Sequence, residues 1–261
     1  MIDASSAPNA PILEFDPATE AIIEPSAWYR PIDGLARHAV ITWMPDAVER
    51  LLAEHEPRER FRVGVESSQT AVNEIDFEGA KLVAVMSPIG APAAAALFEA
   101  LIAIGCTTFT AIGSSGGLLP EHPPGTVVVP DAVIRDDGVS YHYAPAARHA
   151  HPTTDMQQSM RTAFTAAGHT PVTGDVWTTD AIFRETPDKI ALRIDQGAIA
   201  VDMEASALAT IAAFRGVRLG HAVYLADTLH NDIWDPTELI DRDSDFRYEL
   251  LRTAARACLA N

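Results

Sequence analysis

The chain has 261 residues, 48% of them hydrophobic, and 19 Lys and Arg against 36 Asp and Glu give a formal net charge of -17. Its length allows one large α/β domain or two small ones, and we favour one. The acidic balance, without a basic run, argues against nucleic acid or an anionic membrane as partner. No apolar run approaches the ~20 residues of a spanning helix, and no secretory leader pattern is present, so we expect a cytoplasmic protein.

The two cysteines, Cys106 and Cys258, lie far apart in the sequence. This spacing gives neither a disulfide framework nor a set of metal ligands. No cluster of His, Cys and Asp has metal-binding spacing either, so we expect no metal site and no organic cofactor.

Residues 1–37 are rich in Pro, Ala and acids and show little periodicity. They are expected to form an N-terminal extension that is loosely ordered or lies against a neighbouring subunit. The folded domain is expected over residues 38–261.

Strand and helix patterns alternate through this domain. Strands are expected at 38–43, 61–66, 70–76, 81–87, 107–112, 126–134, 172–179, 198–202 and 219–225. Helices are expected at 46–54, from about 92 to 104, at 153–167, 188–196, after 204, and from about 236 to 259. The alternation predicts a single-domain three-layer α/β/α sandwich with a mixed, largely parallel central sheet.

The segment from Ala198 to Leu208 joins an apolar strand to an Ala-rich helix through Asp202, Met203 and Glu204. Alternate side chains of a strand share a face, so the two acids could point toward one ligand while Met203 packs on it. The alternative is that Asp202 caps the helix and Glu204 is an acid favoured by the helix dipole.

Two further stretches are candidates for ligand contact. Residues 113–117, Gly-Ser-Ser-Gly-Gly, are expected to form a loop that permits close backbone approach, with an ordinary tight turn as the alternative. Gly90 precedes an Ala-rich helix whose N-terminus suits anions. In the polar, aromatic loop 135–143, the rings of Tyr141 and His142 could line a ligand, or the loop could simply lie on the surface.

Four blocks in order carry a resemblance: Ile112–Leu118, Trp177–Asp180, Val201–Ser206 and Ala226–Leu229. Together they resemble the nucleoside phosphorylase superfamily, which includes purine nucleoside phosphorylase, uridine phosphorylase and the related nucleosidases. The similarity runs from about residue 40 to the end of the chain. It implies the same three-layer fold, a small-molecule nucleoside as substrate, and a homo-oligomer, from dimer to hexamer, with sites at subunit boundaries.

The resemblance also implies roles for individual residues. Glu204 would accept hydrogen bonds from the ribose 2′- and 3′-hydroxyls, and Met203 would pack on the sugar. Asp202 would occupy the family's other acidic position, one methylene shorter than the usual Glu. Asp227 would protonate the leaving base as a general acid, and Trp177 would stack against that base.

The phosphate-binding pattern of the family is incomplete in this chain. Met44 and Val48 stand where the first loop of the phosphorylases has Gly and Arg, Ala111 replaces a second Arg, and residues 65–68 lack a third. Gly113, Ser114 and a helix N-terminus would have to hold phosphate nearly alone, unless Arg37, Arg50 or Arg135 turns into the site.

Phosphorolysis to free base and ribose 1-phosphate, with inorganic phosphate as co-substrate, is therefore our first expectation. Hydrolysis by a nucleosidase is the alternative, with Asp46, or else Glu49, activating water. A non-catalytic nucleoside-binding protein is a second alternative. The identity of the base is left open, because the side chains with which uridine phosphorylases contact uracil are absent and Arg184 is the nearest substitute.

Overall fold

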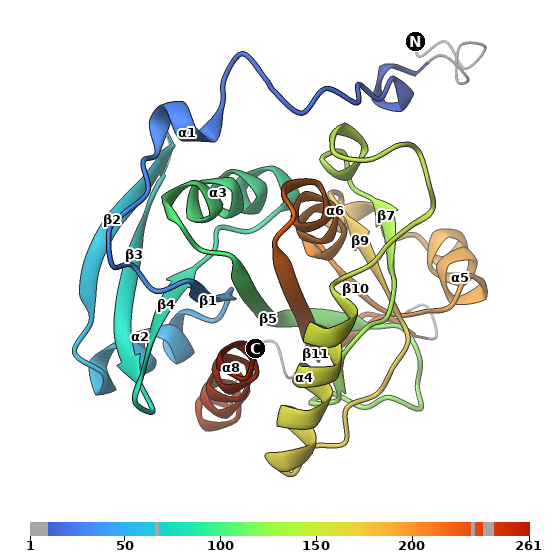
Figure 1. Ribbon diagram of the computed structural model, residues 1–261. Helices are drawn as coiled ribbons and strands as arrows, with labels where there is room; N and C mark the ends of the chain where they lie inside the picture. The colour runs from blue at the N-terminus through green and yellow to red at the C-terminus, as the bar shows by residue number, and fades with distance from the viewer. Residues whose placement is uncertain (1–9, 66–67, 231–232, 237–242) are drawn as a thin grey trace.

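The computed structural model describes residues 10–65, 68–230, 233–236 and 243–261 (Figure 1). The strands are β1 (His38–Thr42), β2 (Arg58–Val65), β3 (Ser68–Phe77), β4 (Ala80–Met86), β5 (Thr108–Gly117), β6 (Val127–Val128), β7 (Val133–Asp136), β8 (His149–Ala150), β9 (Asp175–Thr179), β10 (Ala198–Asp202) and β11 (Arg218–Thr228). The α-helices are α1 (Pro25–Trp28), α2 (Pro45–Glu54), α3 (Ala91–Ile104), α4 (Thr154–Ala166), α5 (Pro187–Asp195), α6 (Ala205–Arg215) and α8 (Ser244–Leu259). Short 3-10 helices are η2 (Pro11–Leu13), η3 (Ser140–His142) and η4 (Ile182–Arg184).

The strands form one mixed sheet in the order β2-β3-β4-β1-β5-β10-β9-β7-β8, and β11 pairs with both β5 and β6. The pairs β1–β4, β1–β5, β5–β11, β9–β10 and β7–β9 are parallel. Helices α3 and α6 cover one face of the sheet, and α2, α4 and α8 cover the other (Figure 1). This arrangement confirms the predicted α/β/α sandwich.

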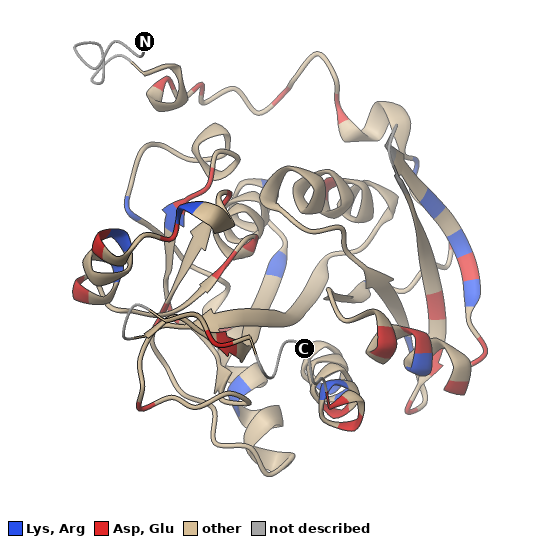
Figure 2. Cartoon of the chain, turned by 180° about the vertical axis from the view of Figure 1, so that it is seen from behind, with Lys and Arg blue, Asp and Glu red and all other residues tan. Residues whose placement is uncertain are grey.

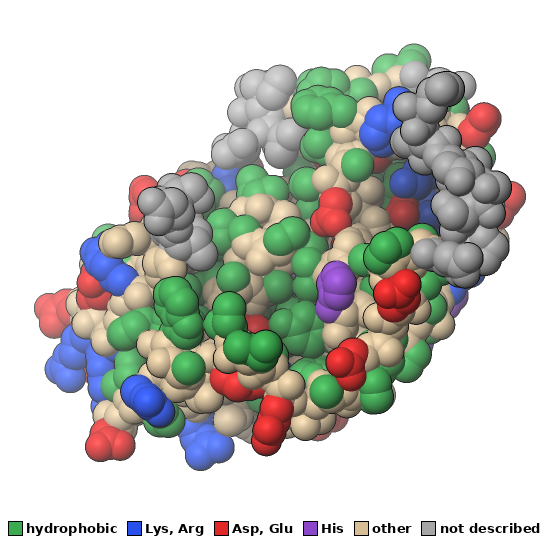
Figure 3. Space-filling model, turned by 90° about the horizontal axis from the view of Figure 1, so that it is seen from above, with side chains coloured by type: hydrophobic (Ala, Val, Ile, Leu, Met, Phe, Trp, Pro, Cys, Tyr) green, Lys and Arg blue, Asp and Glu red, His purple; other side chains and the backbone are tan. Residues whose placement is uncertain are grey.

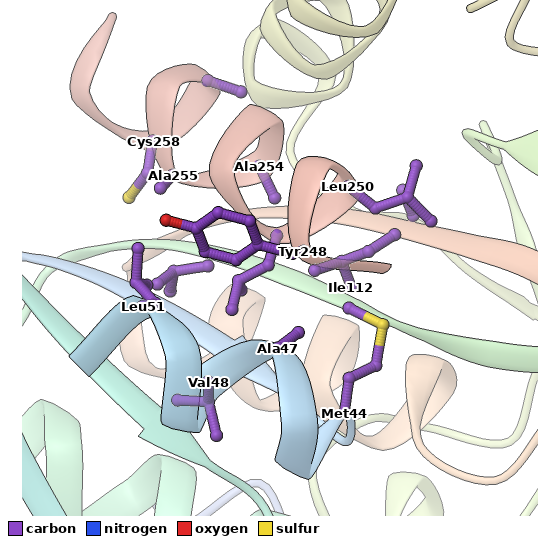
Figure 4. Close-up of a cluster of buried hydrophobic side chains, with 14 of the residues drawn as sticks. Met44, Ala47, Val48, Leu51, Ile112, Tyr248, Leu250, Ala254, Ala255 and Cys258 are labelled. Atoms are coloured by element: carbon purple, nitrogen blue, oxygen red, sulfur yellow. The ribbon is translucent and has the colours of Figure 1, made fainter. Parts of the chain in front are cut away.

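Both faces of the sheet carry a dense apolar core. On the face of α2 and α8, side chains from distant parts of the sequence interlock, including Met44, Leu51, Ile112 and Tyr248 (Figure 4). On the face of α3 and α6, Phe98 and Phe109 pack edge to face with ring centroids 4.6 Å apart. Close packing on both faces holds the strand ends, and hence the side chains that follow them, in fixed positions.

The described part of the N-terminal extension lies in part on its own domain. Tyr29 packs edge to face on Phe61, and the Ile32 amide donates to the Ile104 carbonyl at 3.0 Å. Before α1, side chains such as Ile22 and Ile23 are exposed. The expected contact with a neighbouring subunit remains a prediction, and residues 1–9 lie outside the described residues.

The expected glycine loop at 113–117 is wrong, because these residues continue β5. They pair with β11, from Val223 opposite Gly113 to Thr228 opposite Gly117, and Gly116 also pairs with Val201 of β10. A Cβ atom at Gly116 would lie 2.4 Å from Leu229 and 3.0 Å from Val201. The glycines therefore allow neighbouring segments to approach the strand closely rather than forming a turn.

Other element boundaries also differ from the expectation. The strand expected at 126–134 is two strands, β6 and β7, separated by a segment that contains Pro130. The strand expected at 219–225 continues to Thr228, so Asp227 lies within β11. The last helix begins at Ser244, where the Asp243 carboxylate accepts hydrogen bonds from the amides of Asp245 and Phe246. The expected start near Pro236 precedes residues 237–242, which lie outside the described residues.

Charged side chains are concentrated on β2, β3 and the outer helices, whereas α3 is nearly uncharged (Figure 2). Within the described ranges, no helix is long and apolar enough to cross a membrane.

The Asp243 cap gives a stability test of the observed helix start. Replacing Asp243 by Ala removes the acceptor for two amides, and we expect the free energy of unfolding to fall by about 1 kcal/mol. Asp243→Asn retains a capping oxygen and should stay close to the wild type. Urea denaturation measures both variants, and equal stability of the Ala and Asn variants would show that the cap contributes nothing.

Candidate active site

The junction of β10 and α6 is fixed by the Asp202 carboxylate. Its Oδ2 accepts hydrogen bonds from the amides of Glu204, at 3.2 Å, and Ala205, at 2.8 Å, while its Oδ1 accepts one from Thr178 Oγ1 at 2.7 Å. Asp202 is only 6% exposed. Asp202 thus binds amides at the start of α6, but the N-cap position itself is occupied by Glu204, so the capping alternative is correct only in part. Contact of Asp202 with substrate remains a prediction.

Glu204 lies where two helices begin. Its Oε1 accepts a hydrogen bond from the Gly90 amide at 2.5 Å, immediately before α3, and Glu204 itself immediately precedes α6. Gly90 has a φ of 95°, which favours glycine, so this contact depends on the residue type. Burial, followed by the nearby Asp202 carboxylate, raises the pKa of Glu204 to about 8. Met203, between the two acids, is partly exposed.

Asp227 lies on β11 beside the same edge of the sheet. Gly116 of β5 pairs with Asp227 of β11 on one side and with Val201 of β10 on the other. The backbones of Asp227 and Val201 are therefore two strand spacings apart, roughly 10 Å. Asp202 follows Val201 directly. The Trp234 indole donates to Asp227 Oδ2 at 2.7 Å. The strands that carry the two predicted acidic sites therefore lie on either side of β5, and contact of both acids with one ligand remains a prediction.

Burial raises the pKa of Asp227 above that of an ordinary aspartate. Its neighbour Glu185 was not among the predicted residues, and burial together with the Asp227 charge raises the pKa of Glu185 to about 7. Glu185 follows the Arg184 position directly, but Arg184 itself is exposed. A pair of carboxyls with raised pKa values is suited to proton donation near neutral pH.

The Trp177 ring is buried and has no exposed face on which a base could stack, so the predicted stacking is wrong for this structure. Its ring is 0% exposed, its Nε1 donates to Asp136 at 2.9 Å, and the cations of Lys189 and Arg193 lie within 6 Å of it. The strand is predicted correctly, but α5, which packs against the neighbouring strand β10, brings Lys189 and Arg193 close to the indole.

The aromatic loop is held by its own chain. Tyr141 stacks on the Arg135 guanidinium at 4.5 Å and donates to the Arg135 carbonyl, while His142 is exposed. Tyr143 packs edge to face on Phe214 of α6. These contacts account for the loop conformation, and a role of Tyr141 or His142 in substrate binding remains a prediction.

The Trp43 indole lies next to Gly113 of β5, where phosphate was expected to bind. The indole donates to the Pro88 carbonyl at 2.9 Å, and its Cε3 would lie 3.0 Å from a Cβ atom added at Gly113. Ser114, the next residue, is partly exposed. The indole therefore lies against the backbone of Gly113.

None of the three arginines considered as substitutes turns toward this position. Arg37 donates to Thr107, Arg50 pairs with Glu54 and Asp245 on the outer surface, and Arg135 donates to Ser140 and to loop carbonyls. Arg50 and Arg135 are held by these partners, and Arg37 is exposed beside Thr107, at the end of β1 away from Trp43, so the suggested reorientation is wrong.

Asp46 forms an ion pair with Arg247. Its Oδ1 lies 2.8 Å from the buried Arg247 guanidinium of α8, on the face of the sheet opposite to α6. Glu49, the other suggested base, is exposed on α2. The expectation that Asp46 activates water near the ribose is therefore wrong for this structure.

His221, in the middle of β11, is not among the predicted site residues. Its Nε2 lies 3.6 Å from Asp202 Oδ2, and neither ring nitrogen has a hydrogen bond among the described residues. A single His within the apolar run Leu219–Leu225 was the available signal. Such a residue is often part of a core, and the pattern alone did not place it beside Asp202.

The face that carries α3, α6 and the N-terminal segment is broadly hydrophobic, with single acidic side chains among the apolar ones (Figure 3). Across the described ranges, no group of three or more His, Cys, Asp or Glu side chains gathers in a way that could hold a metal ion.

The chain and its fold correspond to those of a known class of proteins. A family model described as the phosphorylase superfamily matches residues 37–260. The chain belongs to this superfamily, as the sequence resemblance implied.

Individual relatives are more distant. The chain is similar to uridine phosphorylase of Escherichia coli (strain K12), 25% identical over 196 residues that cover 70% of this chain and 76% of that protein. It is 32% identical to uridine phosphorylase of Treponema pallidum (strain Nichols) over 150 residues, 53% of this chain and 58% of the relative. Guanosine phosphorylase of Halorubrum lacusprofundi is 26% identical over 144 residues, 55% of this chain and 60% of the relative.

A solved structure supports the fold. Purine nucleoside phosphorylase from Toxoplasma gondii, in complex with immucillin-H, superposes with a TM-score of 0.71 at 16% identity, covering 86% of this chain and 90% of the other. At this identity the match shows a shared fold.

The raised pKa of Glu204 gives a test of its environment that needs no substrate. The ordinary pKa of 4.5 applies in the unfolded chain, so between about pH 4.5 and 8 the native state binds more protons and stability falls as pH rises. Glu204→Gln removes this loss, and at pH 8 we expect it to be more stable than the wild type by on the order of a few kcal/mol. Below pH 4.5 the two should be nearly equal. Denaturation from pH 4 to 9 checks this, and a constant difference would contradict it.

Proposed function

We propose that this chain cleaves the N-glycosidic bond of a nucleoside and releases the free base. The observation that carries this proposal is the buried Glu204 carboxyl between the starts of α3 and α6, with Asp227 two strands away. One acid then serves the sugar and the other serves the base. This division suits a reaction that develops positive charge on the ribose and negative charge on the departing base.

At the ribose end, Glu204 accepts hydrogen bonds from the 2′- and 3′-hydroxyls, with Met203 against the sugar and the Gly90 amide as a fixed donor. Donors to a carboxylate bind about twice as strongly as donors to a neutral acceptor. Hydroxyl groups that donate to Glu204 also favour its ionised form, so bound ribose opposes the effect of burial.

At the base end, Asp227 supplies a proton to the leaving base. The raised pKa that burial gives Asp227 favours the protonated form that this role requires. Trp234 donates a hydrogen bond to Asp227 and is 60% exposed, so its ring provides an aromatic surface at this end of the site. We propose no metal or organic cofactor, since the two acids suffice for this chemistry.

Phosphate is the first candidate for the acceptor, because the similar proteins carry the names of uridine, guanosine and purine nucleoside phosphorylases. In that reaction phosphate lies against Gly113 and Ser114, and the sugar product is ribose 1-phosphate.

Water is the second candidate, and one observation specifically favours it. The Trp43 indole lies against Gly113, and Arg37, Arg50 and Arg135 are engaged elsewhere. Phosphate normally requires bidentate guanidinium donors in such a site, whereas water needs much less space and no cation.

The reaction and the acceptor can be tested together. We expect release of free base from at least one member of a panel of purine, pyrimidine and 5′-modified nucleosides, unaffected by chelator. Saturable dependence on phosphate with ribose 1-phosphate as product identifies phosphorolysis, and phosphate-independent formation of ribose identifies hydrolysis. Chromatography of both products makes the distinction.

Two controls limit this interpretation. Glu204→Gln should lower kcat/KM, with a loss of transition-state stabilisation on the order of 2 to 4 kcal/mol. Asp227→Asn should slow both phosphorolysis and hydrolysis, because the base must leave in either reaction. Calorimetric binding of a nucleoside without base release from any member of the panel would instead indicate a nucleoside-binding protein.

We also propose that the active form is a homo-oligomer. Large hydrophobic side chains remain exposed on the described surface, among them Met86, Ile89, Ile182 and Phe183. Light scattering should therefore give a mass at least twice the 28.0 kDa of one chain. A fully active monomer at the assay concentration would contradict this.

A further inference from the structure

Helix α6 begins at a residue whose side chain does not cap it. Glu204 occupies the N-cap position, but its carboxylate accepts no hydrogen bond from the helix that it precedes. An N-cap side chain ordinarily accepts the amide two or three residues later, which here belongs to Ser206 or Ala207. The Glu204 carboxylate instead reaches the Gly90 amide before α3. The amides at the start of α6 therefore need acceptors from other elements.

Thr178 of β9 supplies one of these acceptors. Its Oγ1 accepts the Ser206 amide at 3.0 Å and donates to Asp202 Oδ1 at 2.7 Å. Asp202 Oδ2 in turn accepts the amides of Glu204 and Ala205. Three successive amides are thus bound by two side chains that belong to strands, and the N-cap side chain binds none of them.

The register of the sheet places Thr178 at this point. Strands β9 and β10 are parallel, and Thr178 lies directly opposite Asp202. Successive side chains of a strand alternate between its faces, so Thr178 points toward α6, whereas Trp177 lies against α5. Thr178 is 0% exposed, so removal of its hydroxyl would leave a buried amide and a buried carboxylate oxygen without this partner.

A second contact holds the first turn of α6 from the loop after β7. The Ser206 hydroxyl donates to the Asp137 carboxylate, which also accepts the Ser140 amide at 2.7 Å. Ser206, Asp137 and Ser140 are all buried. The helix therefore remains attached to the domain without the Thr178 hydroxyl, whereas the residues before Ser206 lose one of their constraints.

We propose that Thr178 is a positioning residue that accepts an α6 amide in place of the N-cap side chain, so that the Glu204 carboxylate is free to bind the ribose hydroxyls. Because Thr178 is buried, it acts through Ser206 and Asp202 and not by contact with the sugar or the base. This proposal rests on the proposed function for the role of Glu204. The direction of Glu204 then also determines how strongly the site prefers a ribonucleoside to its 2′-deoxy analogue.

Kinetics on a cleaved ribonucleoside and its 2′-deoxy analogue test the proposal. Thr178→Val keeps the shape of the side chain but removes the hydroxyl, and we expect kcat/KM for the ribonucleoside to fall on the order of 100-fold. The preference over the 2′-deoxy analogue should fall about tenfold, because a misdirected Glu204 loses its bond to the 2′-hydroxyl. Thr178→Ser retains the hydroxyl and should restore most of both values.

The matched control is Thr110→Val. Thr110 is also a buried strand threonine, and its hydroxyl donates to the Ala254 carbonyl of α8 at 2.9 Å, on the face of the sheet opposite to α6. Its replacement should lower the free energy of unfolding, as Thr178→Val does, but leave kcat/KM and the preference for the 2′-hydroxyl unchanged. The comparison separates a loss of stability from a loss of direction at Glu204.

A second measurement needs no substrate. Burial is the main cause of the raised pKa of Glu204, and the charges of Asp202 and Asp180 add to it. Thr178→Val retains both acids, but a looser first turn of α6 admits water to Glu204, so its pKa should fall. The stability gain from Glu204→Gln rises with pH and should then level off about one pH unit lower than in the wild-type background. In the Thr110→Val background it should level off at the wild-type pH.

The proposal is overturned if Thr178→Val lowers kcat/KM for both nucleosides equally, or if Thr178→Ser does not restore the preference for the 2′-hydroxyl. It is equally overturned if the stability gain levels off at the same pH in all three backgrounds. If no nucleoside is cleaved, or if the wild type shows no preference for the 2′-hydroxyl, the proposed role of Glu204 fails. The levelling pH alone then decides whether Thr178 positions Glu204.

Discussion

The carboxylate of Asp202 is the contact on which the site depends. It lies at the point where a fully buried strand ends, and it satisfies two backbone amides that the start of α6 would otherwise leave without acceptors. The Thr178 hydroxyl ties the same carboxylate to β9. Because these bonds join a strand to a helix, the direction of Glu204 is set by the packing of the whole sheet.

Asp202 and Glu204 are both buried, and burying two neighbouring carboxylates is electrostatically unfavourable. The fold offsets this cost differently for each residue. Asp202 receives three hydrogen-bond donors, whereas Glu204 receives the Gly90 amide and the partial positive charge at the start of two helices. The compensation for Glu204 is incomplete, as its raised pKa indicates. Hydrogen-bond donors supplied by a ligand would favour the ionised form of Glu204, so this incomplete compensation favours binding of such a ligand.

The sequence predicted the parts of this structure that local patterns determine. The alternation of apolar strands and helices was sufficient for the sandwich, and the passage from Ala198 into an Ala-rich helix placed Asp202 and Glu204 at a strand end. Contacts between distant residues were beyond this reasoning. Asp46 pairs with Arg247, about 200 positions later, and no local pattern indicates such a partner. The strand that carries Trp177 is predicted correctly, but the burial of its ring depends on apolar side chains from distant segments, such as Leu118 and Ile190. The glycines of 113–117 favour a loop, because composition does not distinguish a turn from a strand that its neighbours approach closely.

The position of Trp43 constrains how this site could change during evolution. The indole is bonded to Pro88 and lies on Gly113, so an arginine introduced at Ala111 alone would meet an aromatic ring where an anion should bind. Removing the indole alone would leave a cavity without cations. Neither step is useful without the other, and substitutions coupled in this way have strongly non-additive effects. A guanidinium-based phosphate site therefore requires coupled replacements at Trp43 and Ala111, and no single replacement at either position creates one.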